Sequence, residues 1–175
     1  MLSLGCSKSL MADIVHLYLS PGHNFFGHFG QTPGGHATIE QHNVECVAGR
    51  GLRGDRFFDH KENYKGQVTF FAHEAYEELS RSFDVTDRPP SVFRRNIVTR
   101  GLDLNELIGH QFLLDGVHFE GVEECRPCIW MDQAFAPGAN HALEGRGGLR
   151  ARILSNGWLK RGVSIPWEIL HAALV

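Results

Sequence analysis

The alternation of apolar and polar positions along the chain predicts a series of short β-strands. The strand-like segments are rich in β-branched and aromatic residues, and they end at glycine, proline or asparagine. They cover residues 13–20, 44–48, 67–71, 92–99, 111–114, 117–121 and 149–154. The dipeptide Asp115-Gly116 separates two of these segments and is typical of the tight turn of a β-hairpin.

Helical spacing is clearest in the segment 73–83. One face of this predicted helix carries Ala75, Tyr76, Leu79 and Phe83. The chain shows no internal repeat and no linker long or polar enough to divide it. Many short strands with a few helices therefore predict a single domain, mainly β, built on a barrel-like sheet.

The amino terminus lacks a strand or helix pattern. We expect residues 1–12 to form a flexible tail and residues 13–175 to form the folded domain, with Met11 as an alternative start. Cys6 follows Leu4-Gly5 as in a lipoprotein cleavage site, but the basic start and the apolar stretch that such a signal needs are missing.

Composition narrows the class of protein. The 175 residues match the size of one ordinary domain, and 42% hydrophobic against 21% charged residues is typical of a globular chain. Lys and Arg number 17 against 20 Asp and Glu, so the net charge of −3 offers no overall basic field for nucleic acid. Four cysteines are too few for a disulfide-dense scaffold. The chain also has no run of 18 apolar residues, the length that a membrane-spanning helix needs. We expect a cytoplasmic protein without a nucleic-acid or membrane partner.

The sharpest chemical feature is the pair Cys125 and Cys128. Two cysteines at this spacing can hold half of a zinc site, form a redox disulfide, expose one reactive thiolate or simply pack in the core. A zinc site needs two more ligands, and His118 and His141 do not form a second paired motif. The adjacent Arg126 favours the thiolate interpretation.

Two basic segments suggest an anionic small ligand. In the predicted strand over 92–99, Arg94 and Asn96 would share one face and Arg95 the other, unless this is an edge strand with a solvated arginine pair. The glycine-rich loop over residues 49–56 could cradle an anion with its backbone N–H groups and arginines. It lacks the spacing and the lysine of a nucleotide-binding P-loop.

Six motifs in order give the chain a family resemblance. They are LSPGH ending at His23, GLRGDR ending at Arg56, FRRNI ending at Ile97, LIG ending at Gly109, ECRPC ending at Cys128 and GGLRARIL ending at Leu154. With them the chain resembles a MOSC domain, the module named after the carboxy-terminal part of molybdenum cofactor sulfurases. It is most similar to the small stand-alone bacterial type. The stretch Arg161–Pro166 departs from the family, because it lacks the Gly-Asp often found after the last strand.

The resemblance implies a β-barrel-like fold that binds a molybdenum–pyranopterin cofactor. It implies that Cys128 is the essential cysteine, as a molybdenum ligand or a sulfur carrier, and that Arg94 and Asn96 lie at the cofactor. Pyridoxal phosphate is not expected. The full set of expected cofactor-binding residues is Ser20, His23, Arg53, Asp55, Arg56, Arg94, Asn96 and Arg152.

The resulting hypothesis is an oxidoreductase that reduces N-hydroxylated small molecules. Its electrons would come from an external flavin or iron–sulfur protein. The alternative is a sulfur carrier or cofactor-handling protein with a persulfide on Cys128. A third interpretation is a zinc-stabilised binding module that uses Cys125 and Cys128.

Overall fold

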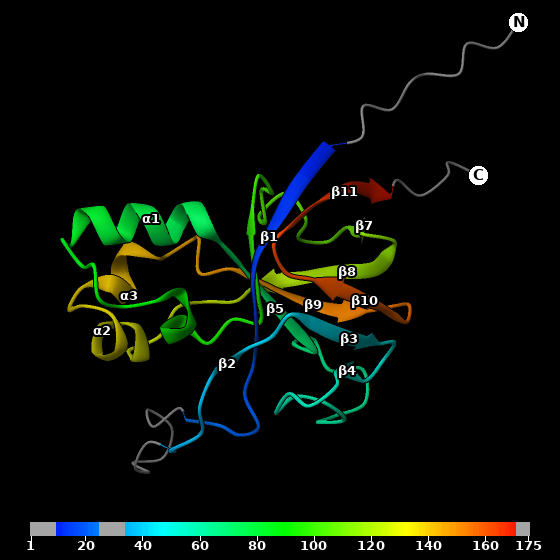
Figure 1. Ribbon diagram of the computed structural model, residues 1–175, viewed down its shortest axis with the longest axis horizontal. Helices are drawn as coiled ribbons and strands as arrows, with labels where there is room; N and C mark the ends of the chain where they lie inside the picture. Colours follow the sequence, from blue (N-terminus) through cyan, green and yellow to red (C-terminus); the bar gives the residue numbers. More distant parts are fainter. Residues whose placement is uncertain (1–9, 25–33, 171–175) are drawn as a thin grey trace, which may run out of the picture.

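Seven strands close into a β-barrel in the computed structural model, which describes residues 10–24 and 34–170 (Figure 1). The strands are β1 (Leu10–Leu19), β2 (Ile39–Glu40), β3 (Asn43–Val47), β4 (Gly51–Leu52), β5 (Val68–Ala72), β6 (Ile97–Arg100), β7 (Gln111–Leu114), β8 (Val117–Glu124), β9 (Leu149–Ile153), β10 (Gly157–Lys160) and β11 (Val163–Leu170). The helices are α1 (His73–Ser82), α2 (Trp130–Ala134), α3 (Ala139–Ala142) and the 3₁₀ helix η1 (Pro90–Phe93).

The barrel follows the order β1-β6-β5-β9-β8-β7-β11, and β11 pairs with β1 to close it. Only the β5–β6 pair is parallel among the barrel strands described, and α1 lies in the crossover between them. The helices gather on one side of the barrel, and the small sheet β10-β3-β4 lies on the other (Figure 1). The mainly β, barrel-like single domain predicted from the sequence is confirmed.

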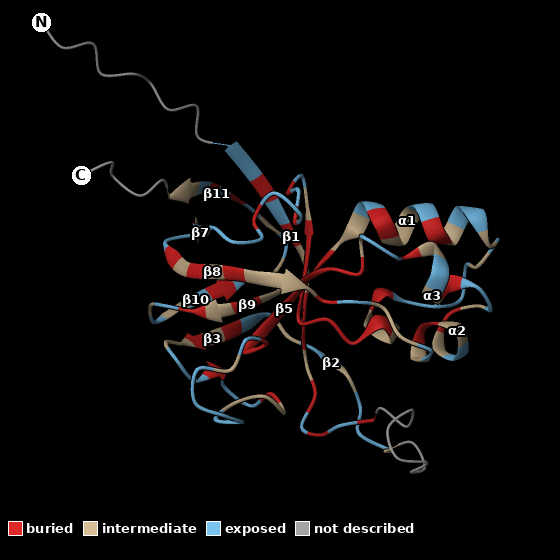
Figure 2. Cartoon of the chain, turned by 180° about the vertical axis from the view of Figure 1, so that it is seen from behind, coloured by how far each residue is buried: buried red, intermediate tan, exposed pale blue. Residues whose placement is uncertain are grey.

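Two apolar clusters stabilise this arrangement, and β5 separates them. Inside the barrel, Phe70 on β5 packs against Phe112 and Phe119, with ring centroids 5.9 and 5.5 Å away. On the outer face, Phe71 packs against Phe93 in the cluster beneath the helices. Successive side chains of a strand point to opposite faces, so a strand buried on both faces reads as a continuous apolar run. Figure 2 shows buried residues on the barrel strands, with β5 buried along nearly its whole length.

Several predicted elements are found close to their expected positions. The predicted helix is α1, and the predicted hairpin is β7–β8. In its turn, Asp115 and Gly116 have φ values of 51° and 76°, which fits the turn type that Asp-Gly favours. Among the described residues, no helix has the length and apolar character needed to cross a membrane.

The first strand begins earlier than expected. Leu10 through Ile14 pair with β11, and Ala12 is buried, so residues 10–12 belong to the barrel. The domain boundary predicted at residue 13 is therefore too late, because the closing partner β11 lies far along the chain and leaves no local signal. The rest of the predicted tail, residues 1–9, lies outside the described residues.

The predicted strand over 92–99 is wrong in its first half. Pro90–Phe93 form η1, Arg94 has a left-handed backbone with φ of 57°, and β6 begins only at Ile97. Proline fixes φ near −65° and suits the first position of a helix, so Pro89-Pro90 starts a helical turn where the apolar pattern indicated a strand.

At the seam where β1 pairs with β11 to close the barrel, two neighbouring substitutions should differ greatly in their effect on stability. Ile14 is fully buried on β1, where it pairs with both β6 and β11. Ile14→Ala should lower the free energy of unfolding by about 2–5 kcal/mol in urea denaturation, the usual range for a buried large-to-small change. Asp13→Ala alters the exposed face of the same strand and should cost less than about 1 kcal/mol. Equal losses would mean that the barrel is not closed at this seam.

Candidate functional site

A pocket of about 550 Å³ lies between η1, the segment that joins β8 to α2, and the loop after β4. Residues far apart in the sequence meet in it. Its described lining is His23, Asn24, Arg56, Phe57, Tyr64, Phe93, Arg94, Arg95, Cys125, Arg126, Cys128, Trp130, Met131 and Arg150. We call it the arginine pocket.

The arginine pocket is strongly positive. Its five arginines are Arg56, Arg94, Arg95, Arg126 and Arg150, and its described lining contains no aspartate or glutamate. Burial, with the charge of Arg56 nearby, lowers the pKa of Arg94 to about 10. Burial also lowers the pKa of Arg56. Both groups stay charged at neutral pH, so an anionic ligand would relieve their mutual repulsion.

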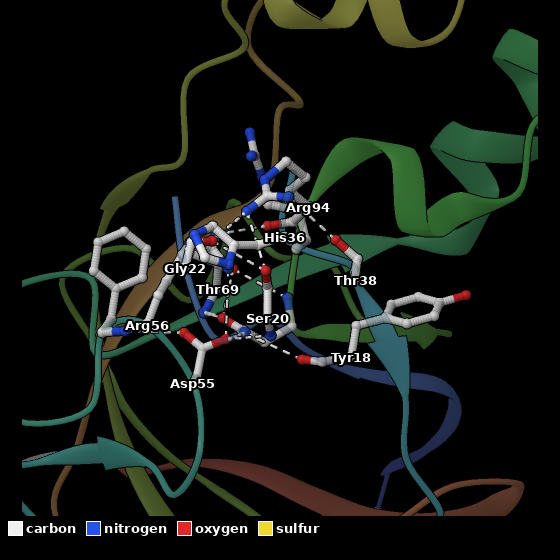
Figure 3. Close-up of polar contacts among 12 residues, drawn as sticks. Tyr18, Ser20, Gly22, His36, Thr38, Asp55, Arg56, Thr69 and Arg94 are labelled. Atoms are coloured by element: carbon white, nitrogen blue, oxygen red, sulfur yellow. Dashed lines mark hydrogen bonds and ion pairs between the residues drawn. The ribbon is translucent and has the colours of Figure 1, made fainter. Parts of the chain in front are cut away.

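Arg94 is held from behind by neutral oxygen atoms. Its guanidinium donates to the Oγ of Ser20 and the carbonyl of Gly22, at 3.3 and 3.0 Å, and to the Oγ1 of Thr38 at 3.3 Å (Figure 3). Its guanidinium carbon lies 5.8 Å from the centroid of the Trp130 ring. None of these acceptors carries a negative charge, so the arginine is oriented without being neutralised.

Asn96 anchors the floor of the pocket. Its Nδ2 donates to the carbonyl of Tyr18 and to Oδ1 of Asp55, at 3.2 and 3.0 Å. Its Oδ1 accepts from the backbone N–H and the hydroxyl of Thr69, at 3.1 and 2.9 Å. The amide is therefore fully used within the protein, and Asn96 joins β1, β5 and the loop after β4.

Asp55 is the buried carboxylate of this region. It accepts hydrogen bonds from the backbone N–H groups of Ser20 and Phe57, at 3.2 and 3.1 Å, and from Asn96. Its Oδ1 lies 3.5 Å from Arg56, whose other terminal nitrogen donates to the carbonyl of Arg94. Asp55 and Ser20 thus lie behind the described lining and position the arginines.

Arg95 lines the pocket together with Arg94. The predicted strand over 92–99 would instead have pointed the two side chains to opposite faces. That prediction is wrong, because residues 94–96 are not in a strand. The buried guanidinium of Arg95 donates to the carbonyls of Cys125 and Gly147 at 2.9 and 3.0 Å. Arg95 therefore holds together the two segments that flank the cysteine motif.

Both cysteines of the pair face the arginine pocket. Cys125 is only 4% exposed, whereas Cys128 is half-buried and more accessible. Burial lowers the pKa of Arg150, but the nearby Cys125, Tyr64 and Glu123 outweigh burial and raise it overall. No group of three or more Cys, His, Asp or Glu side chains suited to a metal ion occurs among the described residues, so the zinc interpretation gains no further ligands there.

His23 lies at the rim of the arginine pocket. Its ring meets the edge of Phe57, with centroids 5.0 Å apart, and lies 6.1 Å from His60. Burial, followed by the charge of Arg56, lowers the pKa of His23. His23 is therefore an uncharged hydrogen-bonding group at neutral pH.

A family model described as MOSC domain matches residues 35–166. The chain belongs to the MOSC domain family. The matched range contains most of the described lining of the pocket, including Arg94 and Cys128. No curated protein matches the chain.

Solved structures share the fold of this MOSC domain at low sequence identity. The YuaD protein of Bacillus subtilis is 17% identical with a TM-score of 0.71, and the match covers 94% of this chain and 99% of YuaD. YiiM from Geobacillus stearothermophilus is 14% identical with a TM-score of 0.63, covering 91% and 75%. YiiM from Escherichia coli is 16% identical with a TM-score of 0.58, covering 88% and 70%. Identities this low establish the common fold only.

Two of the expected site residues of the MOSC domain lie elsewhere. Arg53 pairs with Glu45, and Arg152 pairs with Glu120 at 2.8 Å; neither belongs to the described lining of the arginine pocket. The glycine-rich loop over 49–56 thus contributes Arg56 alone.

Arg150 is a pocket residue that the sequence interpretation missed. It shares the outer face of β9 with Arg152, two positions away, so the period of a strand could not choose between them. Tyr64 and Trp130 were missed as well, because they reach the pocket from loops and a short helix without any pattern.

The network under the pocket predicts that Asn96 is more important for stability than a typical polar residue. Asn96→Ala should lower the free energy of unfolding by about 2–4 kcal/mol in urea, because it removes hydrogen bonds from the buried carboxylate of Asp55 and from the buried backbone N–H and hydroxyl of Thr69. Arg152→Ala removes a partly exposed ion pair and should cost less than about 1 kcal/mol. A loss for Asn96→Ala as small as that of Arg152→Ala would contradict the anchoring role.

The arginine pocket should bind small anions. Inorganic phosphate, compared with chloride at equal ionic strength, should raise the melting temperature of the purified domain. At ten times the dissociation constant the stabilisation is about 1.4 kcal/mol. Arg150→Ala should reduce the shift, whereas Lys160→Ala, at an exposed position of β10, should preserve it. Equal shifts in both variants would place the anion elsewhere.

Proposed function

We propose that this MOSC domain binds a molybdenum–pyranopterin cofactor in the arginine pocket and reduces N-hydroxylated small molecules, with Cys128 as the molybdenum ligand. One observation carries the proposal: five arginines and two cysteines line a single pocket whose described lining contains no carboxylate. The family supports a relation to the molybdenum cofactor.

The residues present fit this cofactor. Its phosphate is an anion that arginine guanidinium groups bind well, and thiolate is a soft metal ligand. A volume of about 550 Å³ is in the usual range for small-molecule and cofactor sites. Cys128 is the more accessible of the two thiols, which favours it over Cys125 as the ligand.

Each part of the pocket has a distinct task in this proposal. Arg94, Arg150 and Arg56 would hold the phosphate and the polar edges of the pterin. Asn96, Asp55 and Ser20 would keep those arginines in place from beneath. When bound, the cofactor supplies the two-electron chemistry, and the protein orients it and sets its electrostatic surroundings.

The proposed reaction needs an external source of electrons. Reduction of R–NH–OH to R–NH₂ breaks the N–O bond, consumes two electrons and two protons, and releases one water molecule. We propose an external flavin or iron–sulfur protein as the electron donor. The proposed setting is the cytoplasm, without a nucleic-acid or membrane partner.

A sulfur carrier is the second candidate. The arginines around Cys125 and Cys128 would also stabilise a negatively charged persulfide on Cys128. In that case the pocket would pass on sulfur or cofactor without a redox reaction of its own.

Elemental analysis of cysteine variants tests the proposed function. The protein is purified from a host that makes the cofactor, and molybdenum is measured per chain. Cys128→Ser should abolish molybdenum retention and reduction activity, because it removes the accessible thiolate. Cys125→Ser should keep most of both, since the buried Cys125 is not the proposed ligand.

The outcomes separate the candidates. Molybdenum together with pterin fluorescence after oxidation supports the oxidoreductase. Labile sulfur without molybdenum supports the sulfur carrier, and stoichiometric zinc supports the zinc-stabilised module. Equal loss of molybdenum in both serine variants would refute the assignment to Cys128 alone.

A further inference from the structure

A second pocket, of about 530 Å³, adjoins the arginine pocket. The two share Asn24, Arg94 and Trp130, so these residues form a common wall. Arg94 spans the wall, because one of its terminal nitrogens donates to Thr38 in the second pocket (Figure 3).

The two pockets differ sharply in charge. Apart from Arg94 in the common wall, the described lining of the second pocket has no arginine, lysine, aspartate or glutamate. Val92 and Ala134 give it apolar surface, and hydroxyl and amide groups give it a polar edge. The second pocket therefore has far less positive charge than the arginine pocket, which favours an uncharged ligand in it.

The polar edge has hydrogen-bonding capacity to spare. The hydroxyl of Ser91 and the side-chain amide of Gln133 make no hydrogen bond with any described residue. Thr38 accepts from Arg94 and still has its own hydroxyl proton to donate. Asn24, by contrast, is held in place, because its amide exchanges two hydrogen bonds with the backbone of His36.

We propose that the second pocket is the substrate subsite and takes an uncharged small molecule with an apolar face and a donor–acceptor edge. The apolar face would lie on Val92 and Ala134. The edge would bond to Ser91 and Gln133, whose amide offers one acceptor and two donors. The reactive N-hydroxyl end would point to the common wall at Arg94, toward the arginine pocket. This inference rests on the proposed function for the identity of the reactive group.

Binding and turnover of benzamidoxime, an uncharged N-hydroxylated probe, test the subsite. Gln133→Leu keeps the size of the exposed side chain but removes its hydrogen bonds. It should raise the dissociation constant, measured by titration calorimetry, and the KM by about three- to tenfold. Molybdenum content, kcat and melting temperature should stay at wild-type values. The matched control Gln111→Leu changes a glutamine on the distant strand β7 and should leave all five quantities unchanged.

Three results would overturn the subsite. The first is a Gln133→Leu variant that binds benzamidoxime as the wild type does. The second is loss of benzamidoxime affinity in Arg150→Ala but not in Gln133→Leu, which would place the probe in the arginine pocket. The third is tighter binding of 4-carboxybenzamidoxime that also depends on Gln133, which would make the pocket selective for anions.

Failure of the subsite is distinguishable from failure of the proposed function. If benzamidoxime binding depends on Gln133 but the molybdenum-loaded protein does not reduce the probe, the subsite stands and the proposed reaction is wrong. If reduction proceeds with a KM that Gln133→Leu does not change, the reaction stands and the subsite is wrong.

Discussion

Arg94 and Arg95 bury two guanidinium groups next to each other in the chain, and the hydrogen bonds that each donates go to neutral oxygen atoms. Taking such a group out of water is costly unless its hydrogen bonds are satisfied. Here they are satisfied mostly by backbone carbonyls from separate parts of the fold, namely Gly22, Phe93, Cys125 and Gly147. The segments around the pocket are therefore fixed relative to one another by the need to solvate two charges.

Satisfying the hydrogen bonds of these arginines does not cancel their charge. Asp55 is the buried acid nearby, and it divides its oxygens among two backbone N–H groups, Asn96 and Arg56. The positive potential of the pocket is thus left for a ligand to neutralise. The same two arginines thus have two effects. Their hydrogen bonds to carbonyl oxygens stabilise the loops around the pocket, and their positive charge, which no carboxylate of the described lining pairs with, gives the pocket its affinity for an anion.

The sequence predicted the elements whose signals are local. The Asp115-Gly116 hairpin and the helix from His73 follow from turn chemistry and apolar spacing, and both are found. The stretch around Arg94 was misassigned, since the two prolines before it override an apolar pattern that reads as a strand. The ordered motifs were enough to identify the family.

Within the site, residue type was predicted better than position. An arginine on the outer face of β9 was expected, but the choice between Arg150 and Arg152 depends on which end of the strand meets the pocket. Asn96 was expected at the cofactor, whereas its amide is used up by β1, β5 and Asp55. Such facts depend on contacts between distant segments, which one sequence does not encode in any short window.

Strand β1 has two roles that couple synthesis of the chain to completion of the site. Its first half pairs with β11, so that residue 10 lies opposite residue 167, and its end leads directly to Ser20 and Gly22, the acceptors that hold Arg94. Contacts so distant in sequence form slowly, because the chain loses the entropy of closing a long loop before the contacts stabilise it. On the ribosome, β1 must wait for its last partner until β11 has emerged and is free to pair. The barrel closes only at that point, and a cofactor that needs the finished pocket can enter only after β11 has joined β1.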